Sequence, residues 1–319
     1  MVLGRRIWQI GTGDNARPYD RYFVTHDVAL LGSGSPGKWS ADNPAYSDER
    51  HIRAFASKPK AGDFIVARRG RKCAVALGVL DGEYDWSEAF DDCEGWDLQH
   101  YWRVHWIWVD EKQFERIVFP WVRFSASHDD EVAVWATALL QDKRIDPPWD
   151  AELKQLPEAE KKLDTSRLEP PLQTIIERAQ AWDDHTWSGD FGDINPTEDE
   201  LLTHITVPLL EALGWEPKQI AVKWRNCDLA LFTENLREPS NCRLVVEGKR
   251  IGDGLNWAAD QAKHYVRKLG LESADVLVTN GLHYRLYQHP QYSDKDALWA
   301  NLVRPKAGAE LLFDALRIS

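Results

Sequence analysis

The stretch CDLALFTENLREPSNCRLVVEGK, residues 227–249, contains two apolar segments that each adjoin a carboxylate. Asp228 opens the first segment, and Glu247 closes the second. Alternate residues of a strand point to the same face, so Glu247 and Lys249 share a face while Gly248 points to the other. A hairpin through residues 233–241 brings Asp228 beside Glu247. The stretch therefore predicts two adjoining strands that bring two acids and an amine together.

This combination of side chains is suited to metal-dependent hydrolysis. Two adjacent carboxylates repel each other unless a cation lies between them, and magnesium accepts such ligands while it keeps most of its waters. The metal polarises a scissile phosphate and lowers the pKa of a water, and Lys249 is placed to orient that water or stabilise developing charge. Gln261 and Tyr265 lie one helical turn apart on the next expected helix, so they face the same way.

The residues around this stretch predict an α/β sandwich built round a mixed sheet. Thr197 and Glu200 form a capping-box pattern at the start of an apolar helix that stops at Gly214. Three strands, a helix and a further strand are expected to follow, at residues 219–222, 228–232, 243–247, 255–268 and 275–279.

Taken in order, these residues resemble the site of the PD-(D/E)xK nuclease superfamily: Glu200, Asp228, Glu247-Gly248-Lys249, Gln261 and Tyr265. The greatest similarity is to the nuclease region of type I restriction motor subunits and to RecB-type nucleases. It covers about residues 200–288, through ELLTHITVPLLEALGW, CDLALF, VVEGKR, QAKHY and VLVTNGLHYRLYQ. The resemblance implies three magnesium ligands (Asp228, Glu247 and Glu200), a catalytic lysine (Lys249) and an accessory pair (Gln261 and Tyr265). Manganese is expected to substitute for magnesium. Cys227 departs from the family, which often has proline or another small residue there.

The first part of the chain has a different pattern. Short β-rich runs broken by Gly, Pro and Asp predict a small, curved β-barrel with strands at residues 6–10, 28–31, 63–68, 74–79 and 101–109 and a helix at 48–57. Residues 129–182 are acidic, alanine-rich and interrupted by prolines, which is typical of a helical connector. The expected fold class is α+β, with a barrel at 1–127, the connector at 128–192 and an α/β domain with a mixed central sheet at 193–319.

Sixteen tryptophans lie mostly in the first half of the chain. The segments KPKAGDFIVARRGRKCAVALGVLDGEYDW and HYWRVHWIWVD resemble the EVE branch of the PUA-like superfamily, which is related to the YTH readers. This resemblance implies a PUA-like barrel that flips a modified base and holds it between aromatic faces. The residues implied for that pocket are Trp39 as one wall, either Trp86 or Trp96 as the second wall, and Asn15 and Ser40 as hydrogen-bonding groups. Trp106 and Trp108 alternate in an expected strand and are predicted to be core or scaffold residues.

A basic run at residues 58–72 offers contacts to a nucleic-acid backbone. Arg68, Arg69 and Arg71 are candidates to hold DNA phosphates, and a solvated turn is the alternative interpretation. Residues 32–38 fit the beginning of a phosphate-binding loop, GxxxxGK. Trp39 stands where that motif needs Ser or Thr, and Pro36 removes an amide, so we expect no nucleotide cofactor and cleavage independent of ATP.

Composition limits the classes of protein further. A formal net charge of -12 argues against indiscriminate coating of nucleic acid. The four cysteines have neither CxxC pairing nor zinc-type histidine spacing. No apolar run approaches the roughly 20 residues that span a bilayer, and the start MVLGRRIWQI lacks a signal-peptide apolar stretch. We therefore expect a cytoplasmic protein with no membrane partner.

The pairing of the two resemblances implies a modification-dependent, type IV restriction endonuclease that acts against phage. It would recognise a modified base in double-stranded DNA and hydrolyse a nearby phosphodiester with magnesium. Because one such site cuts one strand, we expect a homodimer or DNA-induced pairing. Two alternatives stay open: a nuclease acting on modified RNA, and a modified-nucleic-acid binding protein whose nuclease fold is catalytically silent.

Overall fold

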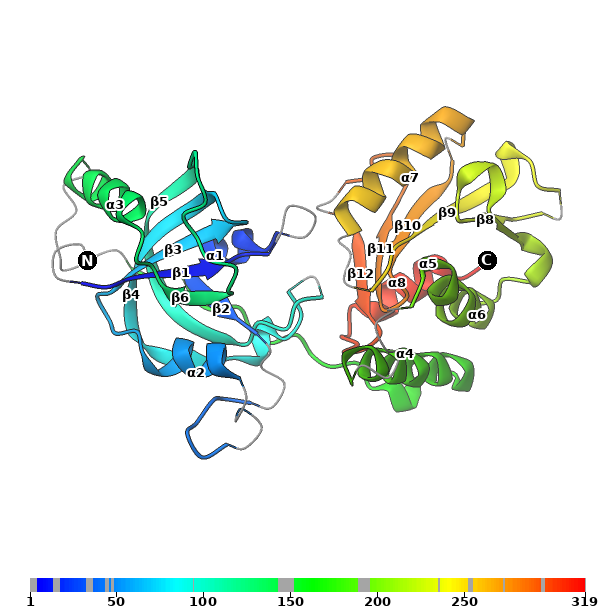
Figure 1. Cartoon of the computed structure of the whole chain (residues 1–319). Coiled ribbons are helices and arrows are strands. Elements are labelled where there is room, and N and C mark those ends of the chain that lie inside the picture. Colours follow the sequence, from blue (N-terminus) through cyan, green and yellow to red (C-terminus); the bar gives the residue numbers. More distant parts are fainter. Residues whose placement is uncertain are drawn as a thin grey trace. The chain divides into compact units, whose positions relative to one another are not determined.

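Two β-sheets organise the chain, and each belongs to its own unit in the computed structural model (Figure 1). The units span Met1–Ala159 and Glu160–Ser319, so the expected connector at 128–192 is divided between them. The structure describes residues 5–13, 18–32, 37–43, 46, 49–93, 95–142, 152–188, 196–234, 236–251, 255–271, 273–293 and 296–318. Within these ranges, no helix combines the length and the apolar character that crossing a bilayer requires.

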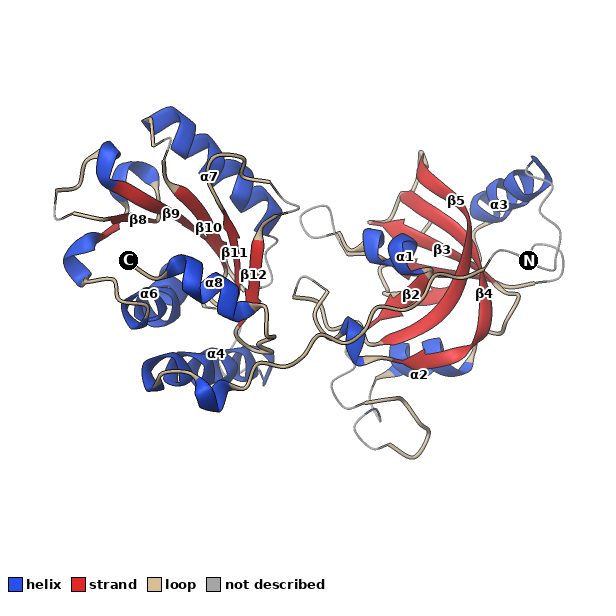
Figure 2. Cartoon of the chain, turned by 180° about the vertical axis from the view of Figure 1, so that it is seen from behind, coloured by secondary structure: helices blue, strands red, loops and turns tan. Residues whose placement is uncertain are grey.

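The first unit contains a six-stranded mixed sheet that curves into a half-barrel (Figure 2). Its strands are β1 (Ile7–Gly11), β2 (Val28–Leu31), β3 (Phe64–Arg69), β4 (Cys73–Trp86), β5 (His100–Gln113) and β6 (Phe124–Ala126). The order is β2-β5-β4-β3-β1-β6; β1 and β3 are parallel and the other pairs antiparallel. The pairing of β4 with β5 shifts register at three places, and such irregularities bend and twist a long strand pair.

Alternating side chains give the first sheet an apolar core on each face. Ile7, Phe64 and Val66 join the core that contains Val132 of α3 (Asp130–Asp142). Their neighbours in the strands join the other core, against α1 (Asp20–His26), α2 (Arg50–Ser57) and the short 3-10 helix Glu88–Phe90. Each fully buried large apolar side chain contributes about 1.5–3 kcal/mol, so both faces are covered by necessity.

The second unit contains the expected mixed sheet. Its strands are β7 (Ile220–Val222), β8 (Leu229–Phe232), β9 (Cys242–Gly248), β10 (Asp275–Thr279), β11 (His283–Tyr287) and β12 (Leu298–Asn301), in the order β12-β11-β10-β9-β8-β7. β9 and β10 are parallel because α7 (Leu255–Leu269) carries the chain back between them, and the other neighbours are antiparallel.

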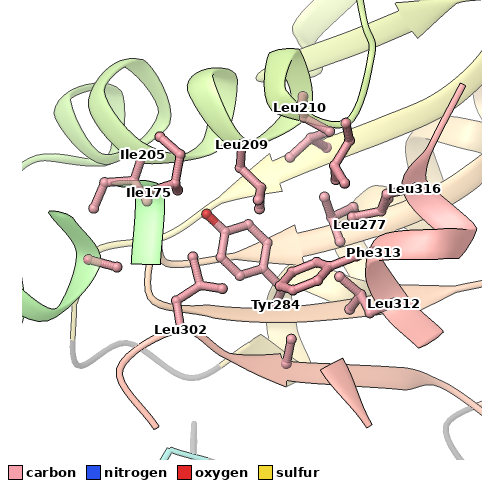
Figure 3. Packing of buried hydrophobic residues seen from close by; sticks show 14 of the residues in the cluster. Ile175, Ile205, Leu209, Leu210, Leu277, Tyr284, Leu302, Leu312, Phe313 and Leu316 are labelled. Atoms are coloured by element: carbon pink, nitrogen blue, oxygen red, sulfur yellow. The ribbon is translucent and has the colours of Figure 1, made fainter. Parts of the chain in front are cut away.

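Helices cover both faces of this sheet. α7 packs on one face over a core that includes Ala230 and Val245. The other face is covered by α4 (Pro170–Ser188), α6 (Val207–Ala212) and α8 (Ala309–Leu316). Figure 3 shows Tyr284 of β11 in this second core beside Leu209 and Phe313. A short helix, α5 (Glu198–Leu201), continues through the π-helical turn Leu202–Thr206 into α6.

Candidate functional site

The pairing of β8 with β9 places Asp228 opposite Glu247. Leu229 pairs with Val246 and Ala230 with Val245, and the same register continued by one residue sets Asp228 against Glu247. Asp228 alternates with Ala230, and Glu247 with Val245, both of which lie in the core under α7. Both acids therefore point to the face of the sheet that α7 covers.

Asp228 is buried, with 7% of its surface exposed, and both of its carboxylate oxygens are occupied. The backbone N–H of Gly248 donates to Oδ2 at 2.7 Å. The ammonium of Lys223 donates to Oδ1, also at 2.7 Å. These two bonds fix the carboxylate against the end of β9.

Glu247 is even more deeply buried, at 3% exposed, and its two oxygens differ. Lys249 donates its ammonium proton to Oε1 at 2.9 Å. Oε2 is buried and has no hydrogen-bond partner. Burial raises the pKa of Glu247, and the charges of Asp228 and Glu198 raise it further, against the opposing effect of Lys249. A buried polar atom left without a partner costs about 1–3 kcal/mol, so Oε2 is a destabilising feature of the fold as it stands.

The donor set fits a hard divalent cation better than zinc. A cation between Glu247 Oε2 and Asp228 would give the unsatisfied oxygen a partner and offset the repulsion between the two acids. Within the described residues, no three His, Cys, Asp or Glu side chains gather as a ready metal cluster. Two carboxylates with waters in the remaining positions is a coordination that magnesium accepts.

Lys223 lies in an unusual turn between β7 and β8. Its ammonium contacts Asp199 at 3.0 Å as well as Asp228, and these hydrogen bonds raise the pKa of Lys223. Three of the four residues from Lys223 to Asn226 have left-handed backbones, with φ of 52° at Lys223, 47° at Arg225 and 75° at Asn226. Each such residue costs roughly 1–2 kcal/mol, so contacts made by the turn must hold it.

Glu200, the third expected metal ligand, makes its hydrogen bonds within its own helix turn. Its carboxylate accepts from Thr197 N at 2.8 Å and from Thr197 Oγ1 at 2.9 Å, which closes the capping box of α5. These hydrogen bonds lower the pKa of Glu200. The acid of this helix turn whose charge reaches Glu247 is Glu198. Glu200 Oε2 therefore serves the helix end, and the metal-ligand role of Glu200 stays a prediction.

Gln261 and Tyr265 come together on α7, as their spacing predicts. The Gln261 amide donates to the Tyr265 hydroxyl at 3.2 Å. Tyr265 packs partly against the core under the helix, while Gln261 is exposed. Since α7 covers the face toward which the acids point, the pair lies on the same side of the sheet as the candidate site.

Sequence reasoning missed three charged residues of this region: Lys223, Asp199 and Glu198. The capping-box pattern could have pointed to Glu198 and Asp199. Such a box uses the carboxylate at its third helical position, Glu200, and does not use the two acids before it. Nothing in the sequence marks the left-handed turn that aims Lys223, since its residues are not the glycines that usually adopt it.

In the first unit, Trp39 follows a backbone segment held by a chain of rings. Tyr46 donates its hydroxyl to Gly37 O at 2.6 Å and contacts His100 Nε2 at 3.1 Å. His100 Nδ1 contacts the Tyr84 hydroxyl at 2.7 Å, which in turn accepts from Trp39 N at 2.9 Å. Burial raises the pKa of Tyr84. The Trp39 backbone is thus anchored, and its indole is half-buried against the core.

The other residues expected in the base pocket have separate surroundings. Trp96 packs edge-on against Tyr19, with ring centroids 5.3 Å apart, and joins the periphery of the core. Trp86 ends β4 and is half-buried. Ser40 is exposed beside Trp39, and Asn15 lies outside the described residues. Trp39 with Ser40 is therefore the part of the expected pocket with the best-defined surroundings.

Trp106 and Trp108 are scaffold residues, as predicted. Trp106 donates its indole N–H to Phe23 O at 2.9 Å and so ties β5 to α1. Trp108 packs edge-on against Trp135 of α3, with centroids 5.1 Å apart.

Arg68 is an internal residue, which corrects its expected role at DNA phosphates. Only 7% of it is exposed, and burial lowers the pKa of Arg68 to about 10. Its guanidinium donates to the side chain of Gln9 and to the carbonyls of Gly70 and Val122, the last two at 2.5 Å each. It therefore links β1 and β3 to the loop before β6.

The other two arginines of the basic run differ from each other. Arg69 is neutralised by Asp20 at 2.9 Å and Glu111 at 2.8 Å. Arg71 donates to a backbone carbonyl and extends its guanidinium over the ring of Trp121, which is 81% exposed. Of the three arginines, Arg71 has the surroundings most compatible with a nucleic-acid contact.

A family model described as "Domain of unknown function (DUF8426)" matches residues 8–118, less than half of the chain. No curated protein matches. A crystal structure of the YTH domain of Zygosaccharomyces rouxii MRB1 protein, in complex with N6-methyladenosine RNA, is similar with 12% identity and a TM-score of 0.29. That similarity covers 47% of this chain and 93% of the YTH chain, and at this TM-score it does not establish a shared fold.

Proposed function

We propose that the chain is a magnesium-dependent endonuclease of the PD-(D/E)xK type that cuts modified double-stranded DNA without a nucleotide cofactor. One observation carries the catalytic part of this proposal. Two buried acids on adjoining strands face the same way, and one carboxylate oxygen of Glu247 lacks a partner while Lys249 flanks the other. This arrangement is costly for a purely structural site and well suited to holding a cation.

Each residue has a definite task in this proposal. Asp228 and Glu247 hold the metal, which when bound supplies the charge that polarises a phosphate and acidifies a water. The ammonium of Lys249 has three N–H donors and donates one of them to Glu247 Oε1. The other two are available to a phosphate oxygen or to the attacking water. Gly248 N–H keeps Asp228 oriented through the bond to Oδ2.

Base reading is assigned to the first unit. The support is the resemblance of its sequence to the EVE branch, together with an anchored tryptophan at the edge of the half-barrel core. Trp39 is half-buried and its backbone is fixed through Tyr84, so its indole is held ready to stack on a base without a large ordering cost.

Digestion of DNAs that carry different modified bases tests both parts. With magnesium and no nucleotide, we expect cleavage of at least one modified DNA, no cleavage of the matched unmodified DNA, and none in EDTA. Equal cleavage of unmodified DNA would refute the reader assignment. Faster cleavage of matched modified RNA would move the substrate to RNA. The Asp228→Asn variant serves as control, and undiminished cleavage by it would refute the site.

Cleavage of supercoiled plasmid shows whether one or two copies of the protein make a double-strand break. Because a single site cuts one strand, we propose that two copies pair on DNA to break both. Linear product should then rise more steeply than nicked product as protein concentration increases. Linear product that stays proportional to protein concentration would contradict the pairing.

A further inference from the structure

The acid pair already has a cation of its own in Lys223. Its ammonium lies 2.7 Å from Asp228 Oδ1 and 3.0 Å from Asp199 Oδ1, and so bridges two carboxylates from different elements. The backbone of Lys223 is also bonded to Asp228, since Lys223 N donates to the backbone carbonyl of Asp228 at 2.8 Å. The ammonium is therefore tethered to Asp228 by a short loop.

This ammonium would compete with a metal ion for a carboxylate oxygen of Asp228. Of the two oxygens of Asp228, Oδ2 accepts from Gly248 N at 2.7 Å, and Oδ1 accepts from Lys223. Glu247 Oε2 is the carboxylate oxygen of the pair that lacks a partner, so a shared cation must reach it and an Asp228 oxygen together. A divalent ion at Oδ1 and an ammonium at Oδ1 repel each other strongly at such short range.

We propose that Lys223 is an internal counter-ion that holds Asp228 in the metal-free protein and is displaced by the divalent cation, so that it sets the metal affinity of the site. This inference rests on the proposed function, since it assumes a metal at the Asp228–Glu247 pair. The inference adds a residue that sets the metal concentration at which the site binds its cation.

Two features allow Lys223 to leave. Its side chain is 53% exposed while that of Asp228 is only 10% exposed, so the ammonium, unlike the carboxylate, regains water when it swings out. Its turn contains three left-handed residues, Lys223, Arg225 and Asn226. Strain of this kind persists only where surrounding contacts enforce it, and release of the ammonium removes one of those contacts.

Titration of the full-length protein with Mn²⁺ alone, after removal of metal with EDTA, tests the proposal by calorimetry. Lys223→Met keeps the length of the side chain and the backbone demand while it removes the charge. It should bind Mn²⁺ about tenfold more tightly than wild type or better. Lys218→Met is the matched control, because Lys218 is similarly exposed and pairs with Glu216, and its affinity should equal that of wild type.

Thermal unfolding gives a second readout that needs no catalysis. In EDTA, Lys223→Met should unfold at a lower temperature than wild type, because Asp228 loses its counter-charge. Mn²⁺ should raise its unfolding midpoint by more than it raises that of wild type. Lys223→Arg keeps the charge and should stay close to wild type in both experiments, which separates loss of charge from damage to the turn.

The outcomes separate the two proposals. If wild type and Lys223→Met bind Mn²⁺ equally, or the variant binds more weakly, the counter-ion role of Lys223 is refuted and the metal site stands. If neither protein binds Mn²⁺, the metal site and the role of Lys223 are both refuted.

Discussion

A carboxylate as deeply buried as Glu247 must be protonated, paired or bound to a cation to be stable. The structure pairs one of its oxygens with Lys249 and leaves the other without a partner. Burial and the charge of Asp228 raise the pKa of Glu247, which means that the charged form is held at a cost. That cost is the residue-scale basis of the proposed metal site.

Glu247→Gln should separate stability from function. The neutral amide removes the unpartnered anionic oxygen and the repulsion from Asp228, while its own oxygen can still accept from Lys249. In EDTA the variant should therefore be more stable than wild type by about 1–3 kcal/mol, as measured by urea unfolding. Mn²⁺ binding and DNA cleavage should both be lost. Exposed Glu216→Gln is the control and should change none of the three. A destabilised Glu247→Gln variant would mean that the wild-type carboxylate is already satisfied.

Lys249→Met should affect catalysis without affecting metal binding. Loss of a group that stabilises charge in the transition state typically lowers the rate about 10²–10³-fold. We therefore expect that decrease in single-turnover cleavage, with Mn²⁺ affinity at least as high as in wild type. A rate within the error of wild type would exclude Lys249 from the chemistry.

The acid pair was predictable from sequence, but its surroundings were not. A period of two along LVVEGK and one hairpin suffice to bring Asp228 and Glu247 to one face. The resemblance alone suggested Glu200 as a metal ligand, and in the structure its Oε2 closes the capping box of α5. Lys223 was missed because its direction depends on left-handed backbone angles that its sequence does not favour.

At the scale of elements, the β3–β4 hairpin holds the first unit together through a buried arginine. Arg68 reaches Gln9 in β1 and the Val122 carbonyl before β6, so three chain segments depend on one guanidinium. A basic run in sequence is therefore divided here between an internal residue and surface residues.

Arg68→Met should lower the free energy of unfolding of the first unit. Removal of the guanidinium leaves buried hydrogen-bond acceptors without a donor. This loss should lower the free energy of unfolding by about 2–4 kcal/mol. Arg71→Met should change stability by less than about 0.5 kcal/mol, as surface substitutions usually do. Chemical denaturation followed by tryptophan fluorescence measures both. Equal stability of the two variants would contradict the internal role of Arg68.

His26 at the end of α1 should give the first unit a pH-dependent stability. Burial, with the nearby charge of Lys154, lowers the pKa of His26 below its ordinary 6.5. The folded state therefore favours the neutral ring; its contribution is fully present above pH 6.5 and is lost as pH falls toward the lowered folded pKa. The unfolding midpoint of wild type should fall more between about pH 8 and about pH 5 than that of His26→Gln. Parallel falls would contradict the shift.

Element prediction was most accurate where apolar periodicity is long. Residues 255–268 were expected as a helix and form α7 (Leu255–Leu269), and the strands at 28–31 and 275–279 have the expected bounds. β4 and β5 are longer than predicted because the end of each strand is polar and is defined by pairing with the beginning of the other. β12 and α8 were not predicted, since tertiary packing rather than local pattern defines them.

At the scale of the whole molecule, each unit has its own sheet and its own apolar cores. We expect two unfolding transitions in calorimetry, and Mn²⁺ should raise the midpoint of only one of them. Asp228→Asn should abolish that shift. A single transition that moves as a whole with Mn²⁺ would show that the units unfold together.

The anomalous difference map of a crystal soaked in Mn²⁺ tests the proposed metal site directly. It should show one ion within coordination distance of Glu247 Oε2 and of an oxygen of Asp228, with waters in the remaining positions. The ammonium of Lys223 should have moved away from Asp228. A map with no ion at this pair would contradict the metal site. An ion at the pair with Lys223 still bridging Asp199 and Asp228 would contradict the displacement of Lys223.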